Sequence, residues 1–95
     1  GEAQIEHIVG LQLARMDKLL AVRKITLELT EAAKALISKE GYEPAFGARP
    51  LKRAIQRLVQ NPLALELLEG RFGDGDHIVG DADGEQLVFR TGGAA

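Results

Sequence analysis

The 95-residue sequence contains no cysteine and no tryptophan, and aromatic residues make up only 4% of it. The absence of cysteine excludes disulfide frameworks and thiolate metal sites, as is usual in cytoplasmic proteins. No apolar run approaches the roughly 18 residues that cross a membrane, and the first residues lack the apolar segment of a signal peptide. We therefore expect a cytoplasmic protein that does not contact a membrane.

A general surface for binding polyanions is also disfavoured. The 12 lysine and arginine residues are outnumbered by 14 aspartate and glutamate residues, which gives a net charge of −2. Few aromatic side chains are available to stack on nucleic-acid bases. Any cationic site in this protein must therefore be local.

The motifs of several enzyme classes are missing. No phosphate loop of the form G-x-x-x-x-G-K-[ST] occurs, and no apolar strand ends in paired acids that could hold magnesium. We interpret the two histidines, His7 and His77, as surface residues, so no Ser-His-Asp set is credible. Four aspartates fail the spacing of a calcium loop and are interpreted as turn residues. They are Asp74, Asp76, Asp81 and Asp83. We expect no metal site in this chain and no hydrolysis of ATP by the chain alone.

Hydrophobic periodicity predicts a helix and then a strand in the first third of the chain. The helical period of 3.6 extends over residues 2 to 21. The apolar stripe of this helix comprises Ile5, Ile8, Val9, Met16, Leu19 and Leu20. Strict alternation then predicts a half-buried strand over residues 23 to 29, in which Ile25, Leu27 and Leu29 share one face.

A second helix is expected to begin after Thr30, whose side chain is a favoured N-cap. Gly41 is expected to end this helix as a left-handed C-terminal residue. The irregular segment that follows has two large side chains, Tyr42 and Phe46. We expect both to pack beneath the loop and to determine where Arg49 points.

The next helix is expected over residues 49 to 60, because Pro50 suits a first helical turn. Its apolar stripe is formed by Leu51, Ala54, Ile55 and Leu58. The opposite side carries Arg49, Arg53, Arg57 and Gln60. Asn61 and Pro62 are expected to restart or kink the helix as its cap and first residue, and Gly70 to end it. The inward residues of this last part are expected to be Leu63, Ala64, Leu67 and Leu68.

Residues 76 to 90 alternate weakly and predict a hairpin, with its turn at residues 81 to 84. Because a lone hairpin is marginally stable, we expect it to join the earlier strand in a three-stranded sheet covered by helices on one side. The predicted fold is therefore α+β, in the order helix-strand-helix-helix(-helix)-strand-strand. It forms a single domain over residues 1 to 95, ordered over about 5 to 90, with 91 to 95 as a tail.

Arg49 is the main candidate for a functional residue. A guanidinium is always charged and presents a planar fork of donors that matches phosphate oxygens. Because the N-terminus of a helix favours negative charge, an arginine at this entrance indicates that an anion binds there. Gly47 either permits the sharp entry and a close backbone approach or is an ordinary turn glycine.

The segment around Arg49 reads YEPAFGARPLKRAIQ and is followed by NPLA. It closely resembles the sensor-2 region of the Clp/HSP-type AAA+ ATPases, and most of all that of the ClpB disaggregases. The GAR tripeptide is shared by several Clp subfamilies, whereas the longer string narrows the match. The resemblance runs from about Ile5 to about Phe89. It implies the C-terminal small, or lid, subdomain of the second ATPase module and not a complete enzyme.

For the site, the resemblance implies that Arg49 is the sensor-2 residue, with Gly47 and Ala48 beside it. The full-length protein would bind ATP or ADP, with Mg, in the large subdomain of the same chain. Arg49 would assist catalysis by binding the γ-phosphate while ATP is intact and would lose that partner after hydrolysis. We expect no nucleotide on the isolated fragment. The family also places the nucleotide base near the first helix, so Ile8 and Gln12 are candidate base contacts. Gln12 is alternatively a polar residue at the edge of the apolar stripe.

The function implied by the resemblance is a nucleotide-sensing lid that couples ATP hydrolysis to subunit motion and to assembly of a homohexamer. The ring would pull unfolded or aggregated polypeptides through its pore. Two alternatives are a free-standing nucleic-acid-binding module that uses the helix from Arg49 to Gln60, and the lid of a protease-associated Clp unfoldase. The charged residues Lys52, Arg53 and Arg57 either contact nucleotide or a neighbouring subunit, or form an ordinary solvated surface.

Overall fold

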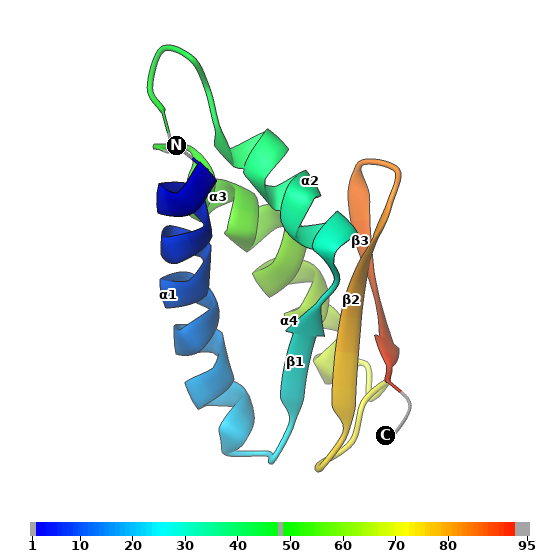
Figure 1. Ribbon diagram of the computed structural model, residues 1–95. Helices are drawn as coiled ribbons and strands as arrows, with labels where there is room; N and C mark the ends of the chain where they lie inside the picture. The colour runs from blue at the N-terminus through cyan, green and yellow to red at the C-terminus, as the bar shows by residue number, and fades with distance from the viewer. Residues whose placement is uncertain (1, 48, 93–95) are drawn as a thin grey trace.

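The computed structural model describes residues 2–47 and 49–92, with side chains described from His7 onward. The elements follow the predicted α+β order, and Figure 1 shows helices gathered around a small sheet. Their bounds are α1 (Glu2–Ala21), β1 (Thr26–Leu29), α2 (Glu31–Gly41), α3 (Leu51–Ile55), the π-helical turn η1 (Gln56–Gln60), α4 (Asn61–Leu68), β2 (His77–Asp83) and β3 (Gln86–Thr91). Within the described residues, no helix combines the length and the hydrophobicity that crossing a bilayer requires.

The three strands form one mixed sheet in the order β1-β2-β3. β1 and β2 are parallel, with Thr26 opposite His77, whereas β2 and β3 are antiparallel, with Asp83 opposite Gln86. Parallel strands need a long crossover, and here α2, α3, η1 and α4 form it. The predicted three-stranded sheet is confirmed.

The hydrophobic core lies between the sheet and the helices. In β3, Leu87 and Phe89 are buried and Val88 is exposed, so one face of this strand is directed toward the helices. The largest fully buried side chains are Ile37, Leu51, Ile55, Leu63, Ile78 and Val59. They come from α2, from the α3–η1–α4 segment and from β2, so the core joins segments that are far apart in the sequence.

Thr30 connects the end of β1, the start of α2 and the middle of β2. Its hydroxyl oxygen accepts a hydrogen bond from the backbone N–H of Ala33 at 3.1 Å, which confirms the predicted N-cap. The same hydroxyl donates to Asp81 Oδ1 at 2.7 Å. The backbone N–H of Thr30 donates to the carbonyl of Gly80 at 3.0 Å. One residue therefore determines where α2 begins and how it meets the sheet.

In α1 the packed seam is narrower than predicted. The buried residues Val9, Met16 and Leu20 and the partly buried Leu13 follow the 4-3-4 spacing of a single seam. Leu19 lies outside this seam and is 75% exposed, so its assignment to the core was wrong. The side chain of Ile5, another predicted stripe residue, lies outside the described residues.

Of the two alternatives predicted at Asn61, a restart or a kink of the helix, the restart was wrong, because α3, η1 and α4 form one uninterrupted helical segment. Asn61 has helical dihedrals, φ −67° and ψ −47°, and its N–H donates to the carbonyl of Gln56, five residues earlier. Such a π turn accommodates one additional residue and widens the backbone. It lies immediately before Pro62, which in a regular helix would crowd the carbonyl four residues earlier.

The π turn also changes which residues of α4 lie inward. A wider turn rotates the chain less per residue, so Val59 and Leu63 stay on the buried face begun by Leu51. Leu67 packs partly against the core, whereas Ala64 and Leu68 are exposed, the latter by 86%. The prediction that Ala64 and Leu68 lie inward was therefore wrong.

Gly70 ends α4, as predicted, and the structure shows that it does so in the left-handed conformation, φ +78°. The N–H of Arg71 donates to the carbonyl of Glu66 and that of Gly70 to Leu67, the pair of bonds that defines a Schellman motif.

Gly41 has a different role from the predicted one. It is the last residue of α2 and is not left-handed; Tyr42, with φ −113° and ψ 136°, caps the helix in an extended conformation. A Cβ atom at Gly41 would lie 2.9 Å from the Cα of Leu51 and would overlap the Cδ1 atom of the same side chain. Glycine is therefore needed here because α3 begins directly against the end of α2.

The hairpin turn is tighter than predicted. β2 continues through Asp81 and Ala82 to Asp83, and the loop is only Gly84–Glu85, with φ +64° at Gly84. Glycine at the first position of a two-residue loop is typical of a type II′ turn.

Two of the four aspartates predicted in turns therefore belong to a strand, Asp81 and Asp83. The other two precede β2: Asp74 pairs with Arg23 at 2.9 Å, and Asp76 accepts a hydrogen bond from the N–H of Gly73 at 2.8 Å. β3 reaches Thr91, one residue into the predicted tail, and residues 93–95 lie outside the described part.

Replacing Gly41 with alanine is expected to lower the free energy of unfolding by about 1–3 kcal/mol, because the new methyl group overpacks a fully buried contact with Leu51. Gly10→Ala in α1 is the matched control, since a Cβ there meets no atom within 4 Å. This control is expected to raise stability by up to about 1 kcal/mol. Urea denaturation of the two variants measures both values, and equal effects would contradict the role given to Gly41.

The pH dependence of stability is expected to include a contribution from Asp81. The hydroxyl of Thr30 and the N–H of Ala82 donate to its carboxylate and hold the pKa of Asp81 below its ordinary value. A lowered pKa stabilises the folded state fully above the unfolded value of about 3.9, and this stabilisation is lost as the pH falls through the folded pKa. Asp81→Asn is therefore expected to be less stable than the parent protein near neutral pH and to match it in strong acid.

Urea denaturation over a series of pH values tests this expectation. Asp83→Asn is the control, because the structure describes no hydrogen bond or ion pair of the Asp83 side chain. A stability difference for Asp81→Asn that does not change with pH would show that its charge is not involved.

Candidate nucleotide-contact site

The loop between α2 and α3 contains a tight turn at Glu43–Gly47. The N–H of Glu43 donates to the carbonyl of Gly47 at 2.8 Å, and the N–H of Gly47 donates back at 2.6 Å. The N–H of Phe46 also donates to the carbonyl of Glu43, at 3.1 Å. Gly47 has φ +62°, a backbone conformation that residues with a side chain rarely adopt. A Cβ there would meet no atom within 4 Å, so conformation and not crowding requires glycine.

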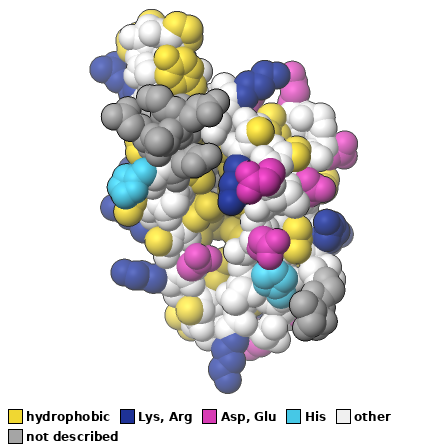
Figure 2. Space-filling model, in the orientation of Figure 1, with side chains coloured by type: hydrophobic (Ala, Val, Ile, Leu, Met, Phe, Trp, Pro, Cys, Tyr) yellow, Lys and Arg dark blue, Asp and Glu magenta, His cyan; other side chains and the backbone are white. Residues whose placement is uncertain are grey.

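Large hydrophobic side chains of this loop are exposed. Tyr42 is 50% and Phe46 51% exposed, so the prediction that both pack beneath the loop was wrong. In Figure 2 hydrophobic side chains lie among other atoms at the tip of the molecule, where Figure 1 places this loop. The backbone bonds of the turn, and not packing, hold the loop together.

Arg49 lies at the base of the loop and is exposed. Its guanidinium carbon is 4.9 Å from the centre of the Phe46 ring, a cation–π distance, and its N–H donates to the Phe46 carbonyl at 3.2 Å. Among the side chains of residues 7–47 and 49–92, no carboxylate forms an ion pair with Arg49. Arg49 is therefore an exposed residue whose guanidinium has, among the described side chains, an aromatic neighbour in place of an acid.

The helix begins later than predicted, at Leu51, and Arg49 belongs to the preceding turn. Pro50 is the N-cap, with φ −74° and ψ −3°, and its carbonyl accepts the first helical bond from Ala54 at 3.0 Å. A residue before proline avoids the helical region of backbone space, which explains why Arg49 is not part of the helix.

Of the other predicted site residues, the structure describes two, Ile8 and Gln12. Ala48 lies outside the described residues. Ile8 and Gln12 are both half-buried on α1, and Ile8 packs against the core. α1 contacts α3, and Figure 1 shows its amino-terminal half beside the chain that enters α3. The two α1 residues therefore belong to the helix that flanks the site, and no direct contact of either with Arg49 is described.

The remaining cations of α3 and η1 are not equivalent. Lys52 and Arg53 are exposed. Arg57 donates from Nη2 to Glu40 Oε1 at 3.1 Å, which joins η1 to α2. An exposed pair of this kind adds at most about 1 kcal/mol to stability, yet it satisfies the Arg57 guanidinium within the chain. Arg49 is thus better placed than Arg57 to receive an external anion.

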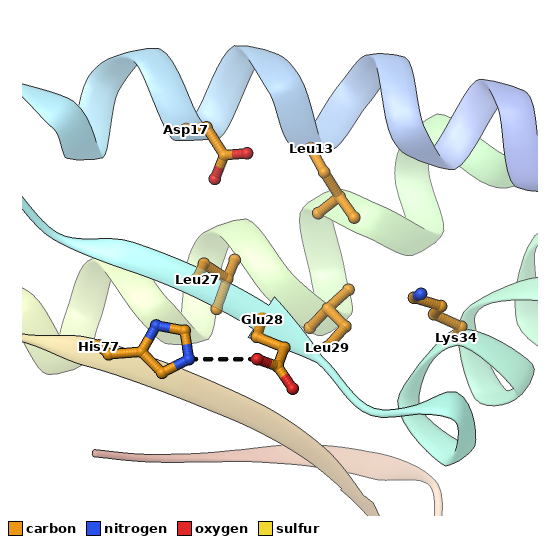
Figure 3. A pocket seen from close by; sticks show the side chains of 7 residues that line it. All are labelled: Leu13, Asp17, Leu27, Glu28, Leu29, Lys34 and His77. Atoms are coloured by element: carbon orange, nitrogen blue, oxygen red, sulfur yellow. Dashed lines mark hydrogen bonds and ion pairs between the residues drawn. The ribbon is translucent and has the colours of Figure 1, made fainter. Parts of the chain in front are cut away.

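A separate groove of about 400 Å³ lies between α1, β1 and the start of α2 (Figure 3). It is lined by Leu13, Asp17, Leu27, Glu28, Leu29, Lys34 and His77. His77, interpreted from the sequence as an ordinary surface residue, is hydrogen-bonded through Nδ1 to the Thr26 hydroxyl at 2.6 Å and through Nε2 to Glu28 at 3.2 Å. These bonds hold β1 to β2. Arg49 is not among the residues that line the groove, so we do not assign the anion site to it.

The described residues also provide no metal centre. Among them, no three histidine or acidic side chains converge in a way that could hold a metal ion.

A small mixed sheet packed on helices, with an exposed arginine after a left-handed glycine, defines the class: this is the C-terminal small subdomain of an AAA+ protein. More particularly, the model of the family described as the C-terminal, D2-small domain of ClpB protein matches residues 1–79, and the chain belongs to this family.

The similarity of the chain to curated proteins agrees with this family. The chain is 58% identical over 87 residues to the chaperone protein ClpB of Gloeobacter violaceus, covering 92% of this chain and 10% of that protein. It is 52% identical over 93 residues to the chaperone protein ClpB of Rhizobium meliloti, covering 98% and 11% respectively. With the ClpB of Rhodopseudomonas palustris it shares 50% identity over 88 residues, covering 93% and 10%. The chain therefore spans about a tenth of the length of the curated relatives it matches.

The conformation of Gly47 gives a test of the loop. Gly47→Ala is expected to lower the free energy of unfolding by about 1–2 kcal/mol, because an L side chain is strained at φ +62°. Gly47→Asn is expected to lower it less, since asparagine tolerates the left-handed region and the surrounding space is open. Denaturant unfolding ranks the three proteins. Equal stability of the parent protein and Gly47→Ala would mean that the loop relaxes without strain.

Proposed function

We propose that this chain is the nucleotide-sensing lid of an ATP-dependent protein disaggregase. The single observation that carries the proposal is the placement of Arg49: the residue is exposed, it lies next to a turn whose backbone is hydrogen-bonded, and no described carboxylate pairs with it. A guanidinium in this position suits the phosphate oxygens of a nucleotide held by another part of the longer protein.

In this proposal Arg49 binds the γ-phosphate of ATP and loses that partner after hydrolysis. The donors along the edge of the guanidinium can bind two phosphate oxygens at once, which determines the direction as well as the strength of the contact. When the γ-phosphate leaves, the small subdomain reorients against the large one. Gly47 supports this role through its turn, while Ile8 and Gln12 flank the base from α1.

The energy of one arginine contact limits the mechanism. A hydrogen bond to a charged group contributes about 1.5–3 kcal/mol, whereas shifting a hinge from 1:99 to 99:1 requires about 5.5 kcal/mol of differential binding. Arg49 alone is therefore too weak to drive the lid. Contacts with the base and with a neighbouring subunit must contribute the rest.

The wider assignment extends to the longer protein. The chain alone contains no phosphate loop, so ATP hydrolysis is assigned to the large subdomain, which would also hold the magnesium. The lid would couple hydrolysis to subunit motion and to assembly of a homohexamer in the cytoplasm. The ring would act on unfolded or aggregated polypeptide. The nucleic-acid alternative gains no support from the geometry, because Arg57 on the helix it would use is paired with Glu40.

Replacing Arg49 with alanine tests the proposal. In the 95-residue chain the free energy of unfolding is expected to change by no more than about 0.5 kcal/mol, because the side chain is exposed. In the full-length protein, ATP binding is expected to weaken by about 1.5–3 kcal/mol and ADP binding to change less, since only ATP has the γ-phosphate. Calorimetric titration of each nucleotide measures both affinities.

Arg53→Ala is the matched control, because this exposed arginine lies on the outer side of α3. It is expected to leave both nucleotide affinities unchanged. A large loss of stability in Arg49→Ala, or equal weakening of ATP and ADP, would argue against a γ-phosphate contact.

A further inference from the structure

Phe46 is exposed and yet makes a specific contact. About half of its side chain faces solvent, so burial of its ring contributes little to the core. The ring lies 4.9 Å from the guanidinium carbon of Arg49, and the Phe46 carbonyl accepts the Arg49 N–H at 3.2 Å. Arg49 is therefore held to Phe46 both through the backbone and through the side chain.

The aromatic ring is itself well oriented. The Phe46 N–H donates to the Glu43 carbonyl, and two further bonds between Glu43 and Gly47 close the turn. The ring therefore projects from a backbone with few degrees of freedom. Tyr42 gives an internal comparison: it is exposed to the same extent in the same loop, but among the described residues no cation lies over its ring.

A cation over an aromatic face leaves the edge of the guanidinium available. The ring attracts the positive charge through its π system, whereas the five N–H donors of arginine lie in the guanidinium plane. A guanidinium stacked flat on a ring therefore keeps the donors that a phosphate needs at its edge. Contact with the ring restricts the rotamers of a long side chain before any ligand arrives, and such preorganisation lowers the entropic cost of binding.

We infer that Phe46 is a positioning residue for Arg49, and that it raises the affinity of the site for a nucleoside triphosphate without touching the nucleotide. This inference rests on the proposed function of Arg49. Exposed cation–π contacts of about 0.5–1 kcal/mol correspond to a two- to fivefold change in affinity. Removing the ring is expected to raise the KM for ATP by about that factor, with kcat nearly unchanged, because the group that reacts is not altered.

The test compares three variants of the full-length protein. Phe46→Leu removes the π face and keeps an apolar side chain. Phe46→Tyr restores an aromatic face and is expected to restore the parent KM. Tyr42→Leu, the matched control, removes an equally exposed ring that lies over no cation and is expected to leave KM unchanged. Steady-state ATP hydrolysis gives kcat and KM separately.

A double variant shows whether the ring acts through Arg49. If it does, adding Phe46→Leu to Arg49→Ala has no further effect on KM, although Phe46→Leu alone raises it. Additive effects would overturn the inference, as would equal effects of Phe46→Leu and Tyr42→Leu. A parent-like KM for Phe46→Leu beside a defective Arg49→Ala would overturn the inference and leave the proposed function intact. No defect in Arg49→Ala would overturn the proposed function itself.

A measurement on the 95-residue chain examines the contact directly. The ring current of Phe46 is expected to shift the NMR signals of the Arg49 side chain upfield relative to those of Arg53, which is exposed and has no described aromatic neighbour. Phe46→Leu is expected to abolish the shift, and Phe46→Tyr to retain it. Arg49 signals that match those of Arg53 in the parent chain would mean that the guanidinium does not occupy the ring face, which would overturn the inference.

Discussion

The contact between Gly41 and Leu51 is the constraint on which the proposed site depends. Leu51 is fully buried, and its Cα lies only 2.9 Å from the position that a Cβ on Gly41 would occupy. The end of α2 and the start of α3 are therefore held together, and the chain between them must leave the core and return. Arg49 lies at the end of this excursion, two residues before Leu51. Close packing of two helix ends thus sets the place of an exposed, charged side chain.

The π turn η1 is the second structural feature that shapes the molecule. It keeps α3 and α4 in one helical segment in spite of Pro62, and it directs Val59 and Leu63 into the same core as Leu51. At the carboxyl end of α4, the consequence is that Leu68 faces solvent. An exposed leucine near the end of a helix is common in itself, but here it follows from the same rotation that buries Leu63.

Arginines that are similar in the sequence differ in the folded protein. Arg49 and Arg57 were both placed on the side opposite the apolar stripe, and a charge row of this kind is usually solvated. In the structure Arg57 reaches Glu40, seventeen residues earlier, while Arg49 lies over the ring of Phe46. The first contact uses donors that an anion would need, whereas the second is a contact with an aromatic ring and not an ion pair with a carboxylate. This difference, and not the charge itself, makes Arg49 the better candidate for a phosphate contact.

The sequence by itself determined the features that depend on local backbone chemistry. The type and order of the elements and the cap at Thr30 follow from periodicity and from a hydroxyl near free N–H groups, and the end of α4 near Gly70 follows from the missing Cβ of glycine. Family membership likewise follows from the string around Arg49, and the match to the ClpB D2-small family supports it. None of these features requires knowledge of what lies across the core.

Only the tertiary structure decided which partner each residue meets. Asp81 is bound by Thr30, fifty-one residues earlier, and Gly41 is required by the side chain of Leu51. Leu19 is exposed because only part of the apolar face of α1 packs against the core, and Leu19 lies on the part that does not. Hydrophobic periodicity in the sequence indicates which residues can be buried, but burial also requires an opposing surface. That surface is supplied by segments distant in the sequence, so it exists only once the chain has folded.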